Sequence, residues 1–153
     1  MGENQSKTSS ARADLESKLK RLQAERDQAR LLFNMANAII LVLDKRANVV
    51  EINTRGAQML GGRPEDIEGR NWIDEFVPEE DWAGVREVFS GIIGSGGDLP
   101  DDVKNHINYV KTVDGRRLLV HWSNTALRDE DGRINGTISS GLDMTKIAQG
   151  LDG

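Results

Sequence analysis

Two Asp-Gly pairs divide the last third of the sequence into three stretches, and this division constrains the fold strongly. The pairs are Asp114-Gly115 and Asp131-Gly132. Asp-Gly favours tight turns between antiparallel strands, because glycine adopts the positive φ angles that such turns require. The stretches that flank these turns are predicted to be β-strands, and they lie at residues 106–112, 116–127 and 134–142.

Two more strands and several short helices are predicted before these three strands. The segment AIILVLDKRANVVEIN, residues 38–53, holds two apolar runs around a polar turn, which is typical of a β-hairpin. Asn53 can cap a short helix over residues 54–61, and Pro64 begins a second helical turn. Residues 78–94 are predicted to form a third helix with one apolar face. This order predicts an α+β fold, in which a five-stranded antiparallel sheet carries short helices on one face.

A long helix is predicted ahead of the sheet. Residues 9–38 contain neither Gly nor Pro, so the helix is assigned to residues 10–36, after a disordered polar tail at 1–9. Apolar residues recur along it at alternating spacings of four, three and seven: Leu15, Leu19, Leu22, Ala29, Phe33 and Ala36. This is a heptad seam interrupted by Arg26. One interpretation is an amphipathic helix that lies on its own domain, but the narrow stripe favours a coiled coil in a homodimer.

This order of elements resembles a PAS sensor domain of the bacterial and archaeal signalling type. INTRGAQMLGGRPEDIEGRNW, residues 52–72, is similar to the strand-ending Asn, the following helix and the GRN segment of that family. DGRRLLVHWSNTALRDEDGRINGTISSGLDMT, residues 114–145, is similar to its closing hairpin and its terminal Asp-x-Thr. The resemblance covers residues 31–146 and implies the PAS fold. The PAS domain is accordingly assigned to residues 37–146, with a C-terminal linker to an output at 147–153.

The terminal Asp-x-Thr corresponds to Asp143 and Thr145. In PAS domains the final strand ends in this pair, and a signalling helix usually follows. Asp143 can accept hydrogen bonds from backbone amides or cap such a helix, so both residues are assigned to signal relay. Only KIAQGLDG follows, without kinase, cyclase or DNA-binding sequence, so the chain is expected to be a receptor fragment or to act through a partner.

The resemblance also suggests cofactors, because PAS domains bind haem, flavins, small organic ligands or nothing. Photoactive flavin-binding members follow GRN with a reactive Cys, but Trp72 stands here and the chain has no Cys, which excludes cysteinyl-flavin photochemistry. Haem-binding members usually place an axial His on the next helix, but residues 78–94 contain none. His106 and His121 are interpreted as surface or sheet histidines, so haem is not expected. A non-covalent flavin or a small organic ligand remains a candidate.

A cavity between the sheet and the helices is expected to hold that ligand. Alternation along residues 116–127 puts Val120, Trp122 and Asn124 on one face, which by resemblance looks into the PAS cavity. The full candidate set is Leu41, Leu43, Trp72, Val88, Asn108, Val110, Val120, Trp122 and Asn124. A hydrogen bond from Asn124 to the neighbouring helix or to Asn108 is favoured over a ligand contact, because buried amides usually pair within the protein.

The other face of the sheet is also apolar. It carries Ile40, Val42, Leu119, Ile138 and Leu142. Such a face needs a cover, and the N-terminal helix of this chain or of a second copy is the expected one.

Composition argues against several classes of function. The net charge of −5 argues against nucleic-acid binding. The longest apolar run, Ala38–Leu43, is too short to span a bilayer, so no membrane insertion and a cytoplasmic location are expected. Acidic residues gather at helix starts and turns, where capping explains them, and no nucleophile, zinc-protease or phosphate-loop motif is present. Neither catalysis nor a metal site is therefore expected.

The predicted function is that of a sensory or regulatory domain in a signal-transduction protein. A histidine kinase of a two-component system, or a similar receptor, is the expected parent. The domain would dimerise and relay a small-ligand or redox signal to an output kinase domain or partner protein. The alternative is a ligand-free PAS domain that serves dimerisation and protein interaction.

Overall fold

The N-terminal unit of the protein is a single helix. The computed structural model describes residues 2–96, 99 and 101–145, and the chain divides into two compact units after Met35. Helix α1 (Gly2–Met35) forms the first unit. It begins at Gly2 and not at Ser10, so the prediction of a disordered tail is wrong for residues 2–9. Polar residues lower helix propensity by only a fraction of about 1 kcal/mol each, and the Thr8 hydroxyl donates to the Asn4 carbonyl inside the helix at 2.8 Å.

The leucine side chains in the heptad seam of α1 are exposed. Leu15, Leu19 and Leu22 expose 67%, 56% and 62% of their surface. Ala29 is also exposed, and Phe33 is half-buried. The seam therefore remains a predicted contact surface for a second helix.

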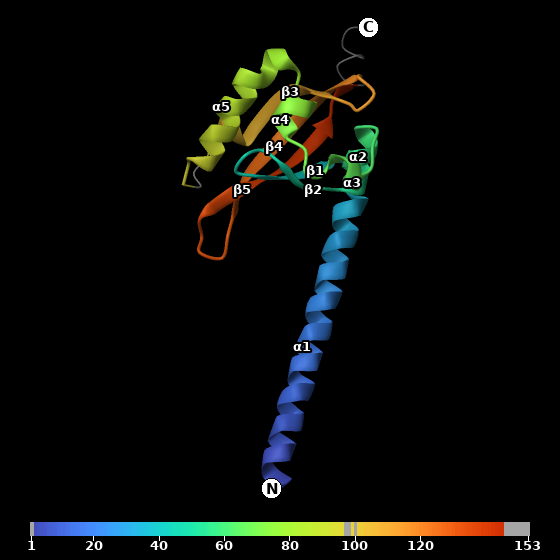
Figure 1. The fold of residues 1–153 in the computed structure, drawn as a ribbon, viewed down its shortest axis with the longest axis vertical. Coiled ribbons are helices and arrows are strands. Elements are labelled where there is room, and N and C mark those ends of the chain that lie inside the picture. Colours follow the sequence, from blue (N-terminus) through green and yellow to red (C-terminus); the bar gives the residue numbers. More distant parts are fainter. Residues whose placement is uncertain (1, 97–98, 100, 146–153) are drawn as a thin grey trace. The chain divides into compact units, whose positions relative to one another are not determined.

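The second unit is built on a five-stranded antiparallel sheet with the strand order β2-β1-β5-β4-β3 (Figure 1). Its strands are β1 (Ile39–Asp44), β2 (Val49–Ile52), β3 (Asn105–Lys111), β4 (Arg117–Arg128) and β5 (Ile134–Asp143). Both the predicted hairpin and the three predicted C-terminal strands are confirmed. The last strand pairs with β1 on one side and β4 on the other, so β5 is the central strand of the sheet.

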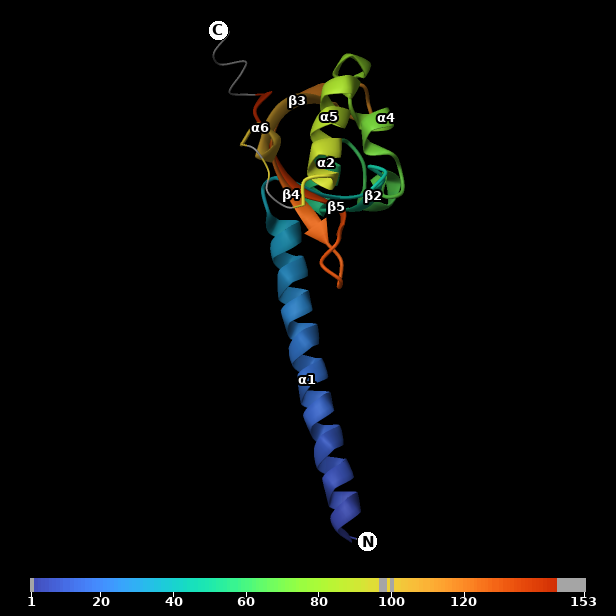
Figure 2. The same cartoon turned by 90° about the vertical axis from the view of Figure 1, so that its left-hand side faces the viewer.

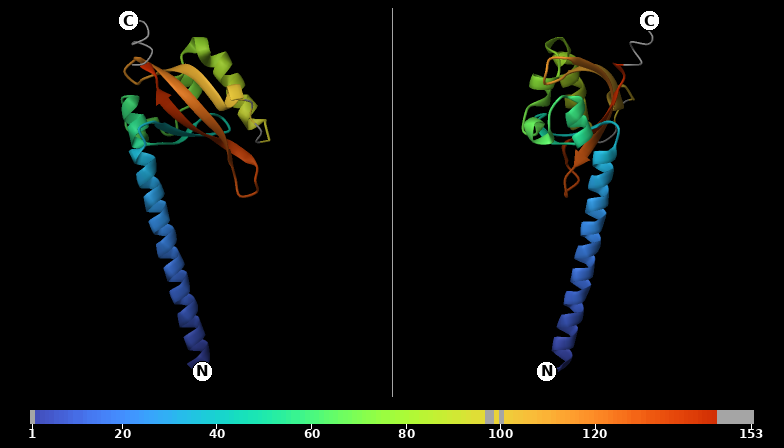
Figure 3. Two further views of the ribbon diagram at one scale, coloured as in Figure 1. Left: turned by 180° about the vertical axis from the view of Figure 1, so that it is seen from behind. Right: turned by 90° about the vertical axis from the view of Figure 1, so that its right-hand side faces the viewer.

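The two Asp-Gly turns adopt the expected conformation. Gly115 and Gly132 have φ angles of 88° and 78°, in the left-handed region that favours glycine. The second turn joins strands that extend beyond their neighbours: β3 pairs only as far as Ser123 of β4, whereas β4 and β5 pair as far as Arg128 (Figure 3). The sheet therefore ends in a long two-stranded hairpin.

Short helices connect the hairpin to the C-terminal strands, and α4 and α5 lie over one face of the sheet (Figure 2). The helices are α2 (Thr54–Met59), α3 (Pro64–Ile67), α4 (Trp72–Phe76), the 3-10 turn η1 (Glu79–Asp81), α5 (Trp82–Ile93) and α6 (Asp101–Lys104). The predicted α5 face is confirmed, since Trp82, Val85 and Phe89 pack against the core. Helix α6 was not predicted, because a single turn is too short to leave a periodic pattern.

Asn53 joins the first strand to the first short helix. Its side-chain oxygen accepts from the backbone N–H groups of Gly56, at 3.1 Å, and Ile40, at 2.8 Å. Its amide nitrogen donates to the Ala38 carbonyl at 2.9 Å. The predicted N-cap is therefore confirmed, and the same side chain, which is fully buried, also fixes the start of β1.

The two faces of the sheet differ in burial. On the inner face, Leu118, Val120 and Trp122 expose only 8%, 0% and 5% of their surface, which confirms the predicted alternation in β4. The outer face exposes large apolar side chains, namely Ile107, Tyr109, Ile138 and Leu142. An exposed apolar row on a sheet is a surface that partners commonly cover.

Candidate functional site

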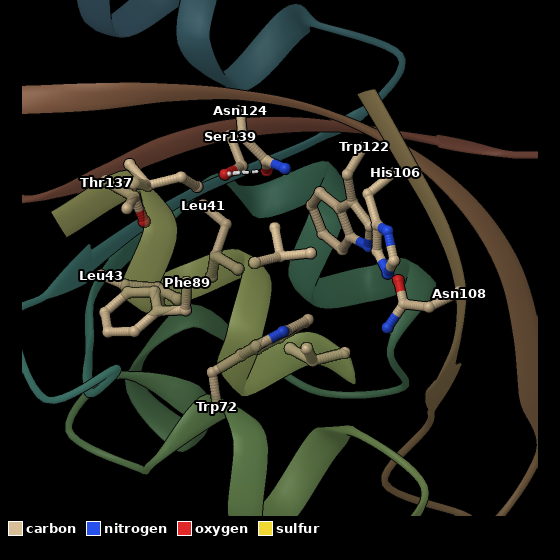
Figure 4. A pocket seen from close by; sticks show the side chains of 13 residues that line it. Leu41, Leu43, Trp72, Phe89, His106, Asn108, Trp122, Asn124, Thr137 and Ser139 are labelled. Carbon is tan, nitrogen blue, oxygen red and sulfur yellow. Dashed lines mark hydrogen bonds between the residues drawn. The ribbon is translucent and has the colours of Figure 1, made fainter. Parts of the chain in front are cut away.

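A cavity of about 50 Å³ lies between the inner face of the sheet and helices α4 and α5 (Figure 4). Side chains from four strands and two helices line it. They are Leu41, Leu43, Trp72, Val85, Val88, Phe89, Ile92, His106, Asn108, Trp122, Asn124, Thr137 and Ser139. The site is therefore mostly apolar, and its polar lining residues include the buried Asn108, Thr137 and Ser139.

Most of the candidate residues named from the sequence lie together at this cavity. They are Leu41, Leu43, Trp72, Val88, Asn108, Trp122 and Asn124. Val110 and Val120 do not line the cavity, although both are fully buried in the adjoining core. Alternation decides which face of a strand a residue occupies, but not which positions along that face lie beside a gap.

Six lining residues were missed by the sequence analysis: Val85, Phe89, Ile92, His106, Thr137 and Ser139. The first three lie on the apolar face of α5 that contains Val88, so helical periodicity carried that signal. His106 lies two residues before Asn108 on β3 and shares its face. Thr137 and Ser139 face inward on β5, which only the pairing register places opposite Leu43 and Leu41.

Two indole rings fill much of the space around the cavity. Trp72 meets Trp122 edge-on, with ring centroids 5.7 Å apart at 89°, and stacks on Phe76 at 5.0 Å. Asn71, the last residue of the GRN segment, positions Trp72 by capping α4: its side-chain oxygen accepts from the Asp74 N–H at 3.1 Å. Its nitrogen donates to the Arg46 carbonyl at 2.8 Å, so this Asn has a structural role.

Asn124 is satisfied within the protein, as predicted. Its side-chain nitrogen donates to the Val103 carbonyl in α6 at 3.0 Å. Its side-chain oxygen accepts from the Ser139 hydroxyl at 2.7 Å, a bond that Figure 4 draws. This confirms the expected bond to a neighbouring helix, but the helix is α6, which the sequence analysis had not predicted.

Asn108 differs from Asn124. It exposes only 8% of its surface, and its nitrogen donates to the Tyr109 carbonyl at 3.2 Å. Across the described residues, its Oδ1 is the buried side-chain nitrogen or oxygen atom that lacks a hydrogen-bond partner. A buried amide oxygen without a partner is uncommon, because it loses hydration without compensation.

Among the described residues, no Asp, Glu, Lys or Arg lines the cavity. The described ion pairs lie on the surface, for example Arg117 with Glu80 and Arg86 with Asp74. Hydrogen bonds from its own backbone N–H and from Arg117 lower the pKa of Glu80. Over residues 2–96, 99 and 101–145, no group of three or more His, Asp or Glu side chains is placed to hold a metal ion.

Haem and flavins do not fit this cavity as it stands. Drug-sized ligands occupy pockets of roughly 300 Å³ or more, and both groups are of that class. The cavity of about 50 Å³ would have to open by displacing Trp72 or Trp122. The wall also offers a single imidazole, that of His106, and no thiolate.

Asp143 and Thr145 lie outside the cavity and tie the end of β5 to β4. The Asp143 carboxylate accepts from the Thr145 N–H at 2.9 Å. The Thr145 hydroxyl oxygen accepts from the Leu119 N–H at 3.0 Å, and the Met144 N–H donates to the Leu119 carbonyl at 2.7 Å. The predicted linker at residues 147–153 lies outside the described residues.

The fold and the cavity together define a PAS domain. A family model described as PAS fold matches residues 33–149, and the chain belongs to this family. A comparison with curated protein sequences found no match. None of the helices in the described part of the chain has the length and hydrophobicity that a membrane crossing requires.

Solved structures of PAS domains are similar throughout the second unit. The PAS domain of an HTR-like protein from Haloarcula marismortui is 20% identical, with a TM-score of 0.68 over 84% of this chain and 98% of that one. A domain of a sensory box sensor histidine kinase/response regulator from Geobacter sulfurreducens is 20% identical, with a TM-score of 0.62 over 80% and 96%. The PAS domain of a LuxR-family transcriptional regulator from Burkholderia thailandensis is 16% identical, with a TM-score of 0.58 over 75% and 96%. These likenesses show the fold.

Proposed function

We propose that this chain senses a small ligand in the cavity and relays the bound state through Asp143 and Thr145 to an output. The observation that carries the proposal is the double role of strand β4. Its residue Trp122 lines the cavity, and its residue Leu119 donates its backbone N–H to the Thr145 hydroxyl and accepts from the Met144 N–H just after β5. A shift of β4 on ligand binding would therefore move Thr145 and the segment that follows β5.

Two neighbours support this proposal by analogy. The Burkholderia thailandensis PAS domain was solved in complex with ethanol, a molecule of a size that suits a cavity of about 50 Å³. The Geobacter sulfurreducens domain belongs to a sensor histidine kinase/response regulator. We propose a kinase domain or a separate partner protein as the output of this chain, with no catalytic role and no nucleic-acid contact of its own, in keeping with its net charge of −5.

Homodimerisation is the second part of the proposal. The seam leucines of α1 expose more than half of their surface, and a narrow apolar stripe on a long helix suits a parallel partner helix. The outer sheet face, with Ile107, Tyr109 and Leu142 exposed, is a further surface that a second copy can cover.

The first test uses the freshly purified full chain. Native mass spectrometry should show one small extra mass per protomer, and visible absorption should show no flavin or haem band. A bare mass that persists after exposure to small-molecule libraries would contradict ligand sensing. A flavin or haem spectrum would show that the cavity opens further than this structure indicates.

A ligand-free domain that serves dimerisation and relay is the competing function. The small cavity volume and the two indole rings that surround it favour this alternative. It predicts that hydrogen exchange in β4 and β5 changes on dimerisation and stays the same with every ligand tested.

A further inference from the structure

We infer that the cavity takes a small uncharged molecule that donates a hydrogen bond to Oδ1 of Asn108. This inference rests on the proposed ligand-sensing function and specifies the chemical class of the ligand.

The orientation of the Asn108 amide is fixed by its neighbour. The side-chain nitrogen donates to the Tyr109 carbonyl at 3.2 Å, and a flipped amide would bring two oxygens together. The side-chain oxygen of Asn108 therefore points away from the Tyr109 carbonyl and lies on the side of His106 in Figure 4. Since this atom is buried and accepts no hydrogen bond from the described residues, it is an acceptor available to an occupant of the cavity.

The amide at the opposite end of the cavity makes no such demand. Asn124 uses its nitrogen for the Val103 carbonyl and its oxygen for the Ser139 hydroxyl. A ligand in this site therefore needs a hydrogen-bond donor that reaches Oδ1 of Asn108. A ligand with acceptor groups alone would leave Oδ1 without a hydrogen bond. An unpaired buried acceptor weakens binding, because its desolvation is uncompensated.

The charge and the size of the cavity restrict the chemical class of the ligand further. Among the described wall residues no Asp, Glu, Lys or Arg is present, so a cation would meet no counter-ion and an anion would meet only the His106 imidazole. Burying an unpaired charge is strongly unfavourable. A volume of about 50 Å³ offers room for about four water-sized groups. Trp72, Trp122 and Phe89 provide apolar surface for a short hydrocarbon part. A short-chain alcohol has this combination of a donor, a small apolar part and no charge.

Three probes with four heavy atoms each separate these requirements. 2-Propanol donates a hydrogen bond, acetone has the same skeleton without a donor, and acetate carries a charge. The full chain is titrated with each probe while the indole N–H signals of Trp72 and Trp122 are followed by NMR. 2-Propanol is expected to bind in the millimolar range and about tenfold more tightly than acetone, and acetate is expected not to bind.

Asn108→Leu tests the acceptor itself, because leucine has a similar volume and no polar atom. In this variant 2-propanol and acetone should bind with equal affinity within about twofold. Asn135→Leu makes the same change at an exposed amide on β5 and should keep the tenfold preference. The comparison of probes in the unaltered chain stands even where Asn108→Leu fails to fold.

Three results would overturn the inference. They are equal binding of 2-propanol and acetone to the unaltered chain, tighter binding of acetate, and a preference for 2-propanol that survives in Asn108→Leu. Amide exchange at Leu119 and Thr145 distinguishes this inference from the proposed function. Asn108-dependent binding with unchanged exchange supports the ligand class and contradicts the relay. A larger or charged ligand that changes this exchange supports sensing and contradicts the ligand class.

Discussion

The hydroxyl oxygen of Thr145 accepts a hydrogen bond of 3.0 Å from the backbone N–H of Leu119. The Met144 N–H donates to the carbonyl of the same Leu119, and the Asp143 carboxylate holds the Thr145 N–H. The two residues that follow the last strand, Met144 and Thr145, are thus both hydrogen-bonded to Leu119 of β4. Leu119 lies between Leu118 and Val120, which are both buried in the core. The backbone of residues 118–120 therefore links the core to Thr145.

Thr145→Val tests this link with a side chain of the same shape. Valine cannot accept the Leu119 N–H, and the loss of one such hydrogen bond typically costs about 1 kcal/mol. We expect faster hydrogen exchange at the Leu119 amide, by roughly fivefold, with little change in α4 and α5. Asp143→Ala should give a similar pattern. Faster exchange centred on Trp72 and α5 would instead place Thr145 in the support of the cavity.

Trp122→Ala should be the most damaging change at the cavity wall. The side chain exposes 5% of its surface and packs edge-on against Trp72, so its removal should cost about 3–5 kcal/mol of unfolding free energy. Urea denaturation measures this loss. Ser123→Ala, at an exposed position beside it on the outer face, should change stability by about 0.5 kcal/mol or less. Similar losses in both variants would contradict the burial assigned to the two faces.

Gly141→Ala should disturb the cavity through Trp122. A Cβ atom at Gly141 would lie 2.6 Å from the Trp122 ring, closer than packed atoms allow, and such overpacking costs about 1–3 kcal/mol. Gly84→Ala is the matched control, because a Cβ there meets nothing within 4 Å and removes a helix-weakening glycine from α5. It should stabilise the protein by roughly 0.5–1 kcal/mol. Urea denaturation should therefore move the two Gly→Ala variants in opposite directions.

The heptad seam of α1 is tested by two leucines with the same exposure. Leu22 lies in the seam and Leu32 lies outside it, and each exposes 62% of its surface. Leu22→Asp should shift the full chain from dimer to monomer in light scattering, because a charge at a core heptad position is desolvated on pairing. Leu32→Asp should leave the mass unchanged. Equal masses for both variants and the unaltered chain would show that the contact lies elsewhere.

Asp114, in the turn between β3 and β4, should contribute a pH-dependent part of the stability. Hydrogen bonds from the Thr112 hydroxyl and from Arg116 lower the pKa of its carboxyl group below the ordinary value of 3.8. A lowered folded pKa stabilises the protein above the ordinary value, and this contribution is lost as the pH falls through the folded pKa. The stability difference between the unaltered chain and Asp114→Asn should therefore be present at neutral pH and shrink below about pH 4. A difference that is the same at every pH would contradict this assignment.

Local sequence signals predicted the order of most elements because each signal acts over a few residues. The two Asp-Gly turns, the Asn53 cap and the alternation along β4 all depend on backbone preferences or on a strict period of two. The start of α1 and the existence of α6 were misjudged for the same reason. Polar residues weaken a helix only slightly, and a single helical turn leaves no period to detect.

Local sequence signals likewise predicted some residues of the candidate site and missed others. Alternation and resemblance brought Trp72, Asn108 and Trp122 into the candidate set, and the structure places all three at the cavity. Thr137 and Ser139 could not be found in this way, because their place depends on how β5 pairs with β1. His106 was treated as a lone histidine, although it shares a face with Asn108.

The sequence by itself determined the faces of the strands and the lack of Cys, because these follow from local pattern and composition, and its motifs resemble those of the PAS family. Only the tertiary structure decided which inward residues border empty space and which amide oxygen accepts no hydrogen bond from the described residues. Asn108 and Asn124 are the same residue type on neighbouring strands, yet only the oxygen of Asn124 meets a donor, the Ser139 hydroxyl. Hydrogen-bond pairing between side chains depends on the register of strands far apart in sequence, and no local pattern encodes that register.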